Sequence, residues 1–268
     1  MVASVCAVGV LGVPAAAEAR QTDPAAGPVP AATQAKQTGT AAEAGQAGQA
    51  GTALAAKVKK AAEPYCVRYK CIALTFDDGP WPYTPELLDT LKKHKAKATF
   101  FLLGRKVGSR AELTRRIVAE GHEVGNHTWD HPDLTTLSNE EILDEMTRTS
   151  EVIDQAIGKA PTMMRPPNGA TDDRVTQLMA ELALPQILWT GSTLDWQSRD
   201  TAVIAKKTLK LAKRNGVILL HDIVPETVKA MPTVLKALEK QNYRFVTVTT
   251  LLQGRELRGG EIYPSRSK

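Results

Sequence analysis

Apolar and polar residues alternate along the chain in two different periods from about position 65 onward. Apolar runs of three to five residues, typical of buried strands, recur between longer segments whose apolar residues repeat every three or four positions, as in helices. Strands are predicted at Ile72–Phe76, Ala98–Leu102, Glu123–Asn126, Met163–Arg165, Gln186–Trp189, Val217–Leu220 and Arg244–Val248. Helices are predicted near 84–94, 109–120, 138–157, 171–182, 200–214 and 225–241. This alternation predicts an α/β fold with a parallel sheet.

Two architectures suit seven such strands. The patterned region, at about 190 residues, is short for an eight-unit barrel but long enough for a compressed seven-unit one. An open, doubly wound sheet is the competing arrangement. Both architectures bind ligands at the carboxyl ends of their strands, so the residues that directly follow each strand are the candidates for chemistry.

The first 62 residues lack this alternation. An apolar run from Val2 to Val13 and the small-residue site Ala17-Glu18-Ala19 resemble the core and cleavage site of a secretory signal, so we expect residues 1–19 to be removed on export. A basic segment before the run is missing, which points to a translation start further upstream. A disordered Ala-rich tail is the alternative. The run is too short to span a membrane.

Residues 20–62 are mostly Ala, Gly, Gln, Thr and Pro and contain no aromatic residue. Such a segment cannot bury enough apolar surface to offset its ordering entropy, so we predict a disordered tether. The folded domain is expected at residues 63–255, with a C-terminal tail at 256–268.

Cysteine content agrees with export, whereas the net charge leaves several alternatives open. Of the three cysteines, Cys6 would leave with the signal, so Cys66 and Cys71 form the remaining pair. We expect a disulfide between them in an oxidising compartment, with two free thiols as the alternative. The net charge of +5 comes without long Lys/Arg runs, so it is only a weak argument for a nucleic-acid partner. It suits an anionic surface such as a cell envelope equally well, and its simplest interpretation is a solvated face without a partner.

Polar and charged side chains follow five of the predicted strands. They are Asp77 and Asp78 in TFDDGP, His127 and His131 in NHTWDH, Arg165 and Asn168 in RPPNG, Asp195 and Trp196 in LDW, and His221 in LLHD. Each alone is most simply a surface ion pair or a solvated group. Because the carboxyl ends of parallel strands meet at one edge, we expect them to form one site.

The two histidines and one aspartate predict a metal site. A four-residue separation would bring His127 and His131 to the same side of a helical turn, and two imidazoles with one carboxylate leave positions open for water, as in catalytic metal sites. Neighbouring strand residues point to opposite sides, so one of Asp77 and Asp78 could bind the cation while the other acts as general base.

Three further residues have predicted roles beside this site. His221 is a candidate general acid, because its pKa lies near working pH, and Asp195 is placed to raise that pKa. Arg165 is suited to hold a carboxylate bidentately. The other histidines are expected elsewhere, His122 in a structural role and His94 solvated among surface lysines.

Together the five motifs make residues 70–252 resemble the polysaccharide deacetylases, the NodB-homology domain of carbohydrate esterase family four. The resemblance implies a distorted (β/α)7 barrel, a shortened form of the TIM barrel. It assigns Asp77 as catalytic base, Asp78, His127 and His131 as metal ligands, and one divalent ion, Zn²⁺ or a similar ion such as Co²⁺. The remaining roles it implies are Arg165 orienting the base, the Asn168 N–H holding an oxyanion, Asp195 tuning the acid His221, and Trp196 and Leu219 lining the substrate pocket.

Two positions depart from the family pattern. Asn168 stands where an aromatic residue is common, and Ser192 stands where a further aspartate is common, three residues before Asp195. Both changes concern contacts with the substrate rather than the acid–base residues.

The resemblance implies an exported hydrolase that removes N-acetyl groups from GlcNAc-containing polysaccharide, such as peptidoglycan or chitin oligomers. An O-acetyl esterase acting on acetylxylan would use the same residues and stays an alternative. An inactive glycan-binding domain would have lost the acid or the base, and both are present. We expect a monomer whose partner is acetylated polysaccharide, with no nucleic acid and no membrane span.

Overall fold

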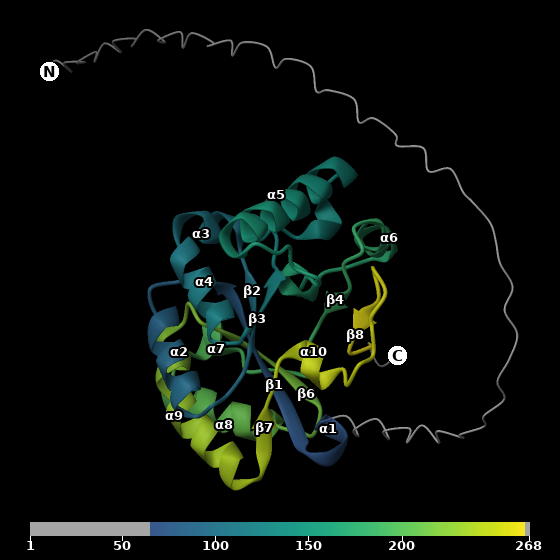
Figure 1. Ribbon diagram of the computed structural model, residues 1–268. Helices are drawn as coiled ribbons and strands as arrows, with labels where there is room; N and C mark the ends of the chain where they lie inside the picture. The colour runs from purple at the N-terminus through teal and green to yellow at the C-terminus, as the bar shows by residue number, and fades with distance from the viewer. Residues whose placement is uncertain (1–64, 266–268) are drawn as a thin grey trace, which may run out of the picture. The chain divides into compact units, whose positions relative to one another are not determined.

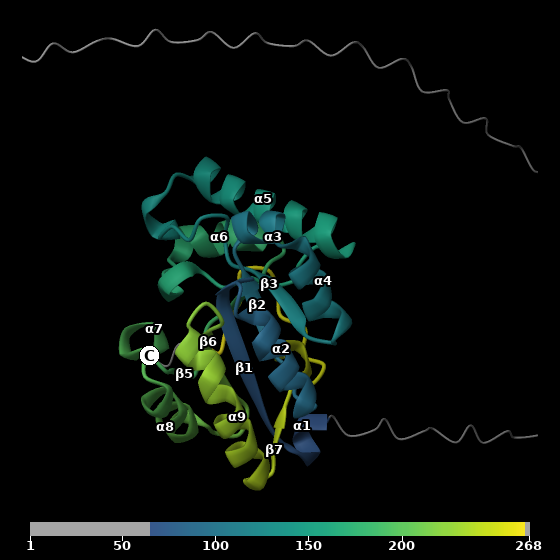
Figure 2. The same cartoon turned by 90° about the vertical axis from the view of Figure 1, so that its left-hand side faces the viewer.

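The computed structural model describes residues 65–265, so the predicted signal segment 1–19 and tether 20–62 lie outside the described residues. In the described part, helices surround a group of parallel strands (Figure 1, Figure 2). The strands are β1 Lys70–Gly79, β2 Thr99–Leu102, β3 Glu123–Asn126, β4 Gln186–Ile187, β5 Gly191–Ser192, β6 Gly216–His221, β7 Tyr243–Phe245 and β8 Ile262–Tyr263. The α-helices are α1 Tyr65–Arg68, α2 Thr84–Lys93, α3 Gly104–Ser109, α4 Ala111–Ala119, α5 Asn139–Ile157, α6 Asp173–Glu181, α7 Asp195–Ser198, α8 Thr201–Leu211, α9 Pro225–Lys240 and α10 Val248–Leu251.

The strands form one continuous wall. Their order is β3-β2-β1-β6-β5, with β7 paired to the first residues of β1, and every pairing is parallel. Isolated bridges from Asn126 to Met164 and from Met164 to Gln186 carry the wall from β3 to β4, which pairs with β8. The wall thus continues past β3 to β4 and β8, as expected for the predicted distorted (β/α)7 barrel.

The central strand β1 has two different buried faces. Ile72, Leu74 and Phe76 pack in a core beneath the outer helices, and Figure 2 shows α2 and α9 side by side over this strand. Cys71 and Ala73 belong to a second core with residues of α10. Since side chains alternate along a strand, the face of Cys71 and Ala73 continues to Asp77, which places this carboxylate at the carboxyl end of the barrel interior.

The predicted strands differ from the observed ones in places that local chemistry explains. Met163–Arg165 forms only a bridge at Met164, because the two prolines that follow have no N–H to donate to a ladder. The predicted strand Arg244–Val248 ends at Phe245, since the Thr247 side chain caps α10. The two-residue strands β5 and β8 were not predicted, as they are too short to show a period of two.

Both ends of the described domain are fixed to the barrel. A disulfide joins Cys66 to Cys71 at the start of β1, as predicted. The predicted C-terminal tail, 256–268, contains β8, which pairs with β4 (Figure 1), so the fold continues beyond position 255. Each helix within residues 65–265 is too short or too polar to span a lipid bilayer.

Candidate active site

The two adjacent aspartates at the end of β1 point toward the same site. Regular alternation would send their carboxylates to opposite sides, but Asp78 has a left-handed backbone with φ of 69°. The β1–β2 register also shifts between Asp77 and Gly79. Asp77 Oδ2 and Asp78 Oδ1 consequently lie 3.7 and 3.5 Å from His127 Nε2. The expectation that the strand itself separates the two acids was wrong.

Asp78, His127 and His131 fit a cation. Their three candidate ligand atoms lie within 4.8 Å of one another, and Asp78 Oδ1 is also 3.5 Å from His131 Nε2. Asp78 Oδ1 is buried and has no hydrogen-bond partner among the described residues. His127 Nδ1 is 2.7 Å from the Arg165 carbonyl, so this nitrogen donates and Nε2 keeps its lone pair toward the site. Three acceptor atoms thus converge without a positively charged partner in the described domain, and a divalent cation would be that partner.

The surroundings of Asp78 and His131 favour the protonation states that bind a metal ion. Burial raises the pKa of the Asp78 carboxyl, but the neighbouring His127, with smaller contributions from His221 and His131, outweighs burial and holds that pKa well below its usual range. Burial, followed by the neighbouring His127, lowers the pKa of His131 and favours its neutral ring. An ionised carboxylate and neutral imidazoles are the forms that bind metals.

The two histidines meet through a loop and not through a helix. The predicted helical turn is wrong, because residues 127–133 contain no helix and Thr128 and His131 both have positive φ angles. The loop is held by side chains: the Asn126 Oδ1 accepts from the Thr128 N–H, and the Thr128 hydroxyl accepts from the His131 N–H. The rings lie 5.0 Å apart at an angle of 70°.

Arg165 is fully buried and fixes the orientation of Asp77. Its Nη1 donates to Asp77 Oδ1 at 2.7 Å and to the Thr75 hydroxyl at 2.8 Å. Its Nε and Nη2 donate to the carbonyls of Ile187 and Leu188 in β4 and just after it. The predicted bidentate grip is therefore wrong, because one nitrogen holds the carboxylate. The other Asp77 oxygen, Oδ2, stays directed toward His127.

His221 lies opposite the histidine loop, as the register partner of Asp77 in β6. Its Nδ1 is 2.8 Å from Asp195 Oδ1, and Asp195 Oδ2 accepts from the His221 N–H and from the Thr227 hydroxyl. Burial lowers the pKa of His221, but the hydrogen bond and charge of Asp195 outweigh it, with help from the other nearby carboxylates, and raise this pKa to about 9. The ring is therefore protonated near neutral pH and can donate from Nε2.

The two aspartates Asp77 and Asp78 and the three histidines His127, His131 and His221 line a cavity of about 460 Å³. Its walls include the predicted substrate-contacting residues Asn168, Trp196 and Leu219. Asn168 has a φ of 56°, and the Trp196 side chain is one of the most exposed large apolar groups in the described domain, at 54% exposure. The cavity also includes Trp189 and Ser192.

The sequence prediction missed several residues of the site. Trp189 ends a predicted strand, and its position at a carboxyl end could have identified it. Leu194, in a left-handed conformation on the cavity wall, and Thr227, bonded to Asp195, show no sequence signal. Thr227 lies in the first turn of α9, so only the tertiary fold brings it to the site.

The remaining histidines are structural. His122 is 6% exposed, its Nδ1 accepts from the Ala98 N–H, and burial with the charge of Lys97 lowers its pKa to about 4, as its predicted role requires. His94 was expected to be solvated, but its Nδ1 lies 3.0 Å from Glu239 Oε1 and only 15% of its side chain is exposed. His94 and Glu239 are 145 residues apart in the sequence, so no local sequence pattern predicts their contact.

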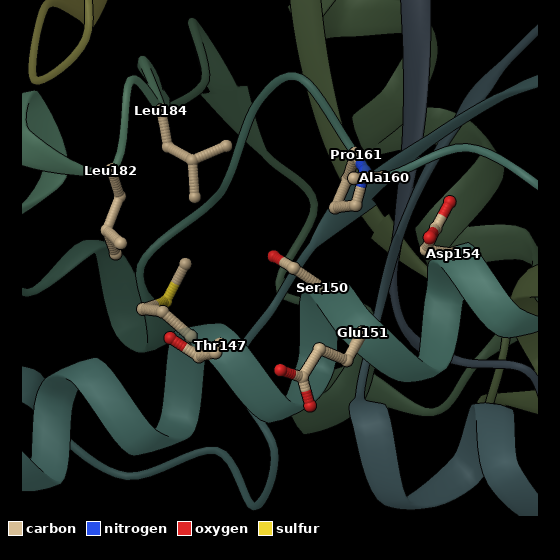
Figure 3. Close-up of a pocket in the computed structure, with 9 residues that line it drawn as sticks. Thr147, Ser150, Glu151, Asp154, Ala160, Pro161, Leu182 and Leu184 are labelled. Atoms are coloured by element: carbon tan, nitrogen blue, oxygen red, sulfur yellow. The ribbon is translucent and has the colours of Figure 1, made fainter. Parts of the chain in front are cut away.

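A second cavity, of about 280 Å³, lies beside α5. Side chains of this helix, among them Thr147 and Ser150, face Leu182 and Leu184 across it (Figure 3). Its lining contains two acidic residues of α5, Glu151 and Asp154, but no histidine, lysine or arginine. It therefore has neither an acid–base pair nor a metal-ligand group.

The fold and the site define an α/β barrel with an acid–base pair and a set of metal-ligand side chains, and comparisons with known proteins identify its family. Residues 65–187 match the family model for polysaccharide deacetylase. A peptidoglycan-N-acetylglucosamine deacetylase of Bacillus cereus is 38% identical over 190 residues, which cover 69% of this chain and 89% of that protein. The chain belongs to the polysaccharide deacetylase family.

Other relatives extend the comparison. A peptidoglycan-N-acetylglucosamine deacetylase of Listeria monocytogenes is 42% identical over 211 residues, or 78% of this chain, but this chain spans only 44% of that protein. A solved structure described as T48 deacetylase with substrate is 41% identical with a TM-score of 0.71, covering 74% of this chain and 98% of that one. A family 4 acetyl xylan esterase from Clostridium thermocellum, solved with a cobalt ion, is 33% identical with a TM-score of 0.68, covering 74% and 99%.

Proposed function

We propose that this chain is an exported, metal-dependent hydrolase that removes N-acetyl groups from GlcNAc-containing polysaccharide, peptidoglycan above all, and releases acetate. One observation carries the proposal: Asp77, held by Arg165, and His221, held by Asp195, are register partners on neighbouring strands beside the Asp78–His127–His131 group. A base, an acid and a cation site around one cavity are what hydrolysis of an unreactive amide requires.

The residues divide the reaction between them. A divalent cation held by Asp78, His127 and His131 would supply positive charge that polarises the acetyl carbonyl and acidifies water. Asp77 would take a proton from the attacking water at Oδ2, because Arg165 occupies Oδ1.

The acid and the oxyanion donor complete the reaction. The backbone N–H of Asn168, on the cavity wall, would donate to the oxyanion of the tetrahedral intermediate. His221 would then donate its Nε2 proton to the departing sugar nitrogen as the C–N bond breaks. The products are acetate and a free sugar amine.

The nature of the cation follows from its ligands. Two imidazoles and one carboxylate suit Zn²⁺, and Co²⁺ accepts the same donors. The cobalt ion described for the Clostridium thermocellum relative supports this assignment.

Export and the preferred substrate have separate support. The signal-like segment 1–19, the Cys66–Cys71 disulfide and the positive net charge support a location at the cell envelope, where peptidoglycan lies. The names of the Bacillus cereus and Listeria monocytogenes relatives favour an N-acetyl group on peptidoglycan. The acetyl xylan esterase similarity keeps an O-acetyl ester as the second candidate.

Acetate release tests both candidates. The purified chain should release acetate from peptidoglycan and chitopentaose faster than from acetylxylan, and a chelator should stop the reaction until Zn²⁺ or Co²⁺ is restored. Faster release from acetylxylan would establish the esterase instead. Activity that persists in the chelator, or no activity on all three glycans with Zn²⁺ or Co²⁺ added, would reject the proposal.

A further inference from the structure

Asp78 is an extra residue at the end of β1. The pairing of β1 with β2 passes from Asp77, opposite Phe101, to Gly79, opposite Leu102, and the pairing with β6 ends at Asp77. Asp78 thus has no partner residue in either neighbouring strand. A bulge of this kind redirects a side chain and leaves the extra residue outside the ladder.

This bulge is what brings the Asp78 carboxylate to the histidines. Without it, alternation would turn the Asp78 side chain away from the interior that Asp77 faces. The left-handed backbone at Asp78 is unfavourable for a residue with a Cβ, so surrounding contacts must hold it.

Lys106 makes a direct hydrogen bond to the backbone of Asp78. From α3, which follows β2 closely (Figure 1), Lys106 Nζ donates a hydrogen bond of 2.8 Å to the Asp78 carbonyl. The same Nζ lies 4.5 Å from the centre of the Trp81 ring, three residues further along the turn. The ammonium group of the half-buried Lys106 side chain therefore contacts both ends of the segment that redirects Asp78. The next residue of the turn is held as well, since the Gly79 carbonyl accepts from the Leu103 N–H.

We infer that Lys106 is a positioning residue that holds Asp78 in its left-handed conformation and so prepares the Asp78 carboxylate to bind the cation. The inference rests on the cation site of the proposed function. Lys106 does not line the cavity and has no contact with the reacting atoms, so its effect passes through Asp78.

A purely electrostatic role would have the opposite sign. Lys106 is positively charged and lies near the metal site, so its charge alone repels the metal ion. Removal of Lys106 should therefore strengthen metal binding if charge is all that matters, and weaken it if the hydrogen bond to Asp78 matters more.

Calorimetric titration of metal-free protein with Zn²⁺ separates these possibilities. Lys106→Met keeps the length of the side chain and its packing on Trp81 but removes the donor, and we expect Zn²⁺ affinity to fall about tenfold. Arg110→Met is the matched control, because the Arg110 guanidinium lies 4.7 Å from the same Trp81 ring and makes no hydrogen bond to Asp78. Its Zn²⁺ affinity should stay near that of the unmodified chain.

The titrations distinguish failure of the Lys106 inference from failure of the proposed function. If the unmodified chain does not bind Zn²⁺, the cation site itself is refuted. If it binds and Lys106→Met binds equally or more tightly, or if Arg110→Met loses as much affinity, Lys106 is not a positioning residue. Should Lys106→Met not fold, Lys106→Gln replaces it, since the shorter amide does not reach the carbonyl, and the same tenfold loss is expected.

Discussion

His221 and Asp195 show how one residue sets the working range of another. The Asp195 carboxylate accepts hydrogen bonds from the His221 ring and backbone and from Thr227, so it stays in place beside the ring. The ring loses solvent contact, which alone would lower the pKa of His221, and gains a fixed negative neighbour, which raises it to about 9. A general acid at this position keeps its proton over the whole neutral range.

The pH dependence of turnover should report this pair. The protonated ring is the active form, so kcat should fall as pH rises through about 9. Asp195→Asn removes the negative charge and should move this alkaline limb at least one pH unit lower, with a reduced plateau. The measurement is kcat for acetate release from chitopentaose across pH at saturating Zn²⁺.

A second histidine–carboxylate pair provides the control for this profile. His94 directly follows α2 and its partner Glu239 lies in α9, both outside the cavity, so Glu239→Gln should leave the alkaline limb in place. An unmoved limb in Asp195→Asn would show that His221 is not the titrating acid.

Among the elements, the carboxyl end of β1 is the most constrained. Gly79 follows the bulge, and a Cβ at this position would lie 2.5 Å from the buried Asp222 carboxylate. That carboxylate also accepts from the Thr84 hydroxyl at the start of α2. Strand end, helix start and buried acid thus share a space that has no room for a methyl group.

Gly79→Ala should therefore destabilise the fold, by about 1–3 kcal/mol in the free energy of unfolding. Gly108→Ala, in α3, is the comparison, because its Cβ would meet only Val152 at an ordinary 3.7 Å. Alanine is the better helix residue, so this change should be neutral or stabilising by about 0.5–1 kcal/mol. Urea denaturation of both variants checks the contrast, and equal effects would contradict it.

The elements also mark the limit of prediction from the sequence. Periodicity located β1, β2, β3 and β6 and the long helices, because each buries a regular face. It did not reveal that Asp78 forms a bulge or that the segment from His127 to His131 is a loop. Asp and His adopt left-handed conformations more often than most residues, but still too rarely for their presence to predict one. Lys106 and Thr227 were missed for a different reason, since their partners are distant in the sequence.

At the scale of the whole molecule, parallel topology made the site predictable. Four motifs each follow a different strand and RPPNG follows the bridge at Met164, and these parallel segments all end at the same edge of the barrel. The sequence therefore indicated which residues would meet. It could not indicate their geometry, such as the single nitrogen by which Arg165 holds Asp77, because that depends on where the carbonyls of Ile187 and Leu188 lie.

The division of labour between Asp77 and Asp78 is tested most directly by comparing two neutral substitutions. Asp78→Asn should weaken Zn²⁺ binding by at least about tenfold, because it removes a charged ligand. Asp77→Asn should bind Zn²⁺ as the unmodified chain does but release acetate about a thousandfold more slowly, because it removes the base. Asp89→Asn, an exposed aspartate paired with Arg116, is the control and should change neither quantity.

The decisive measurement is Zn²⁺ affinity and acetate release determined on the same preparation of Asp77→Asn. Retained affinity with lost turnover is the predicted result, and it would place the base and the ligand on neighbouring residues of one bulged strand end. If Asp77→Asn instead loses Zn²⁺, or keeps its turnover, the roles assigned to the two aspartates are wrong.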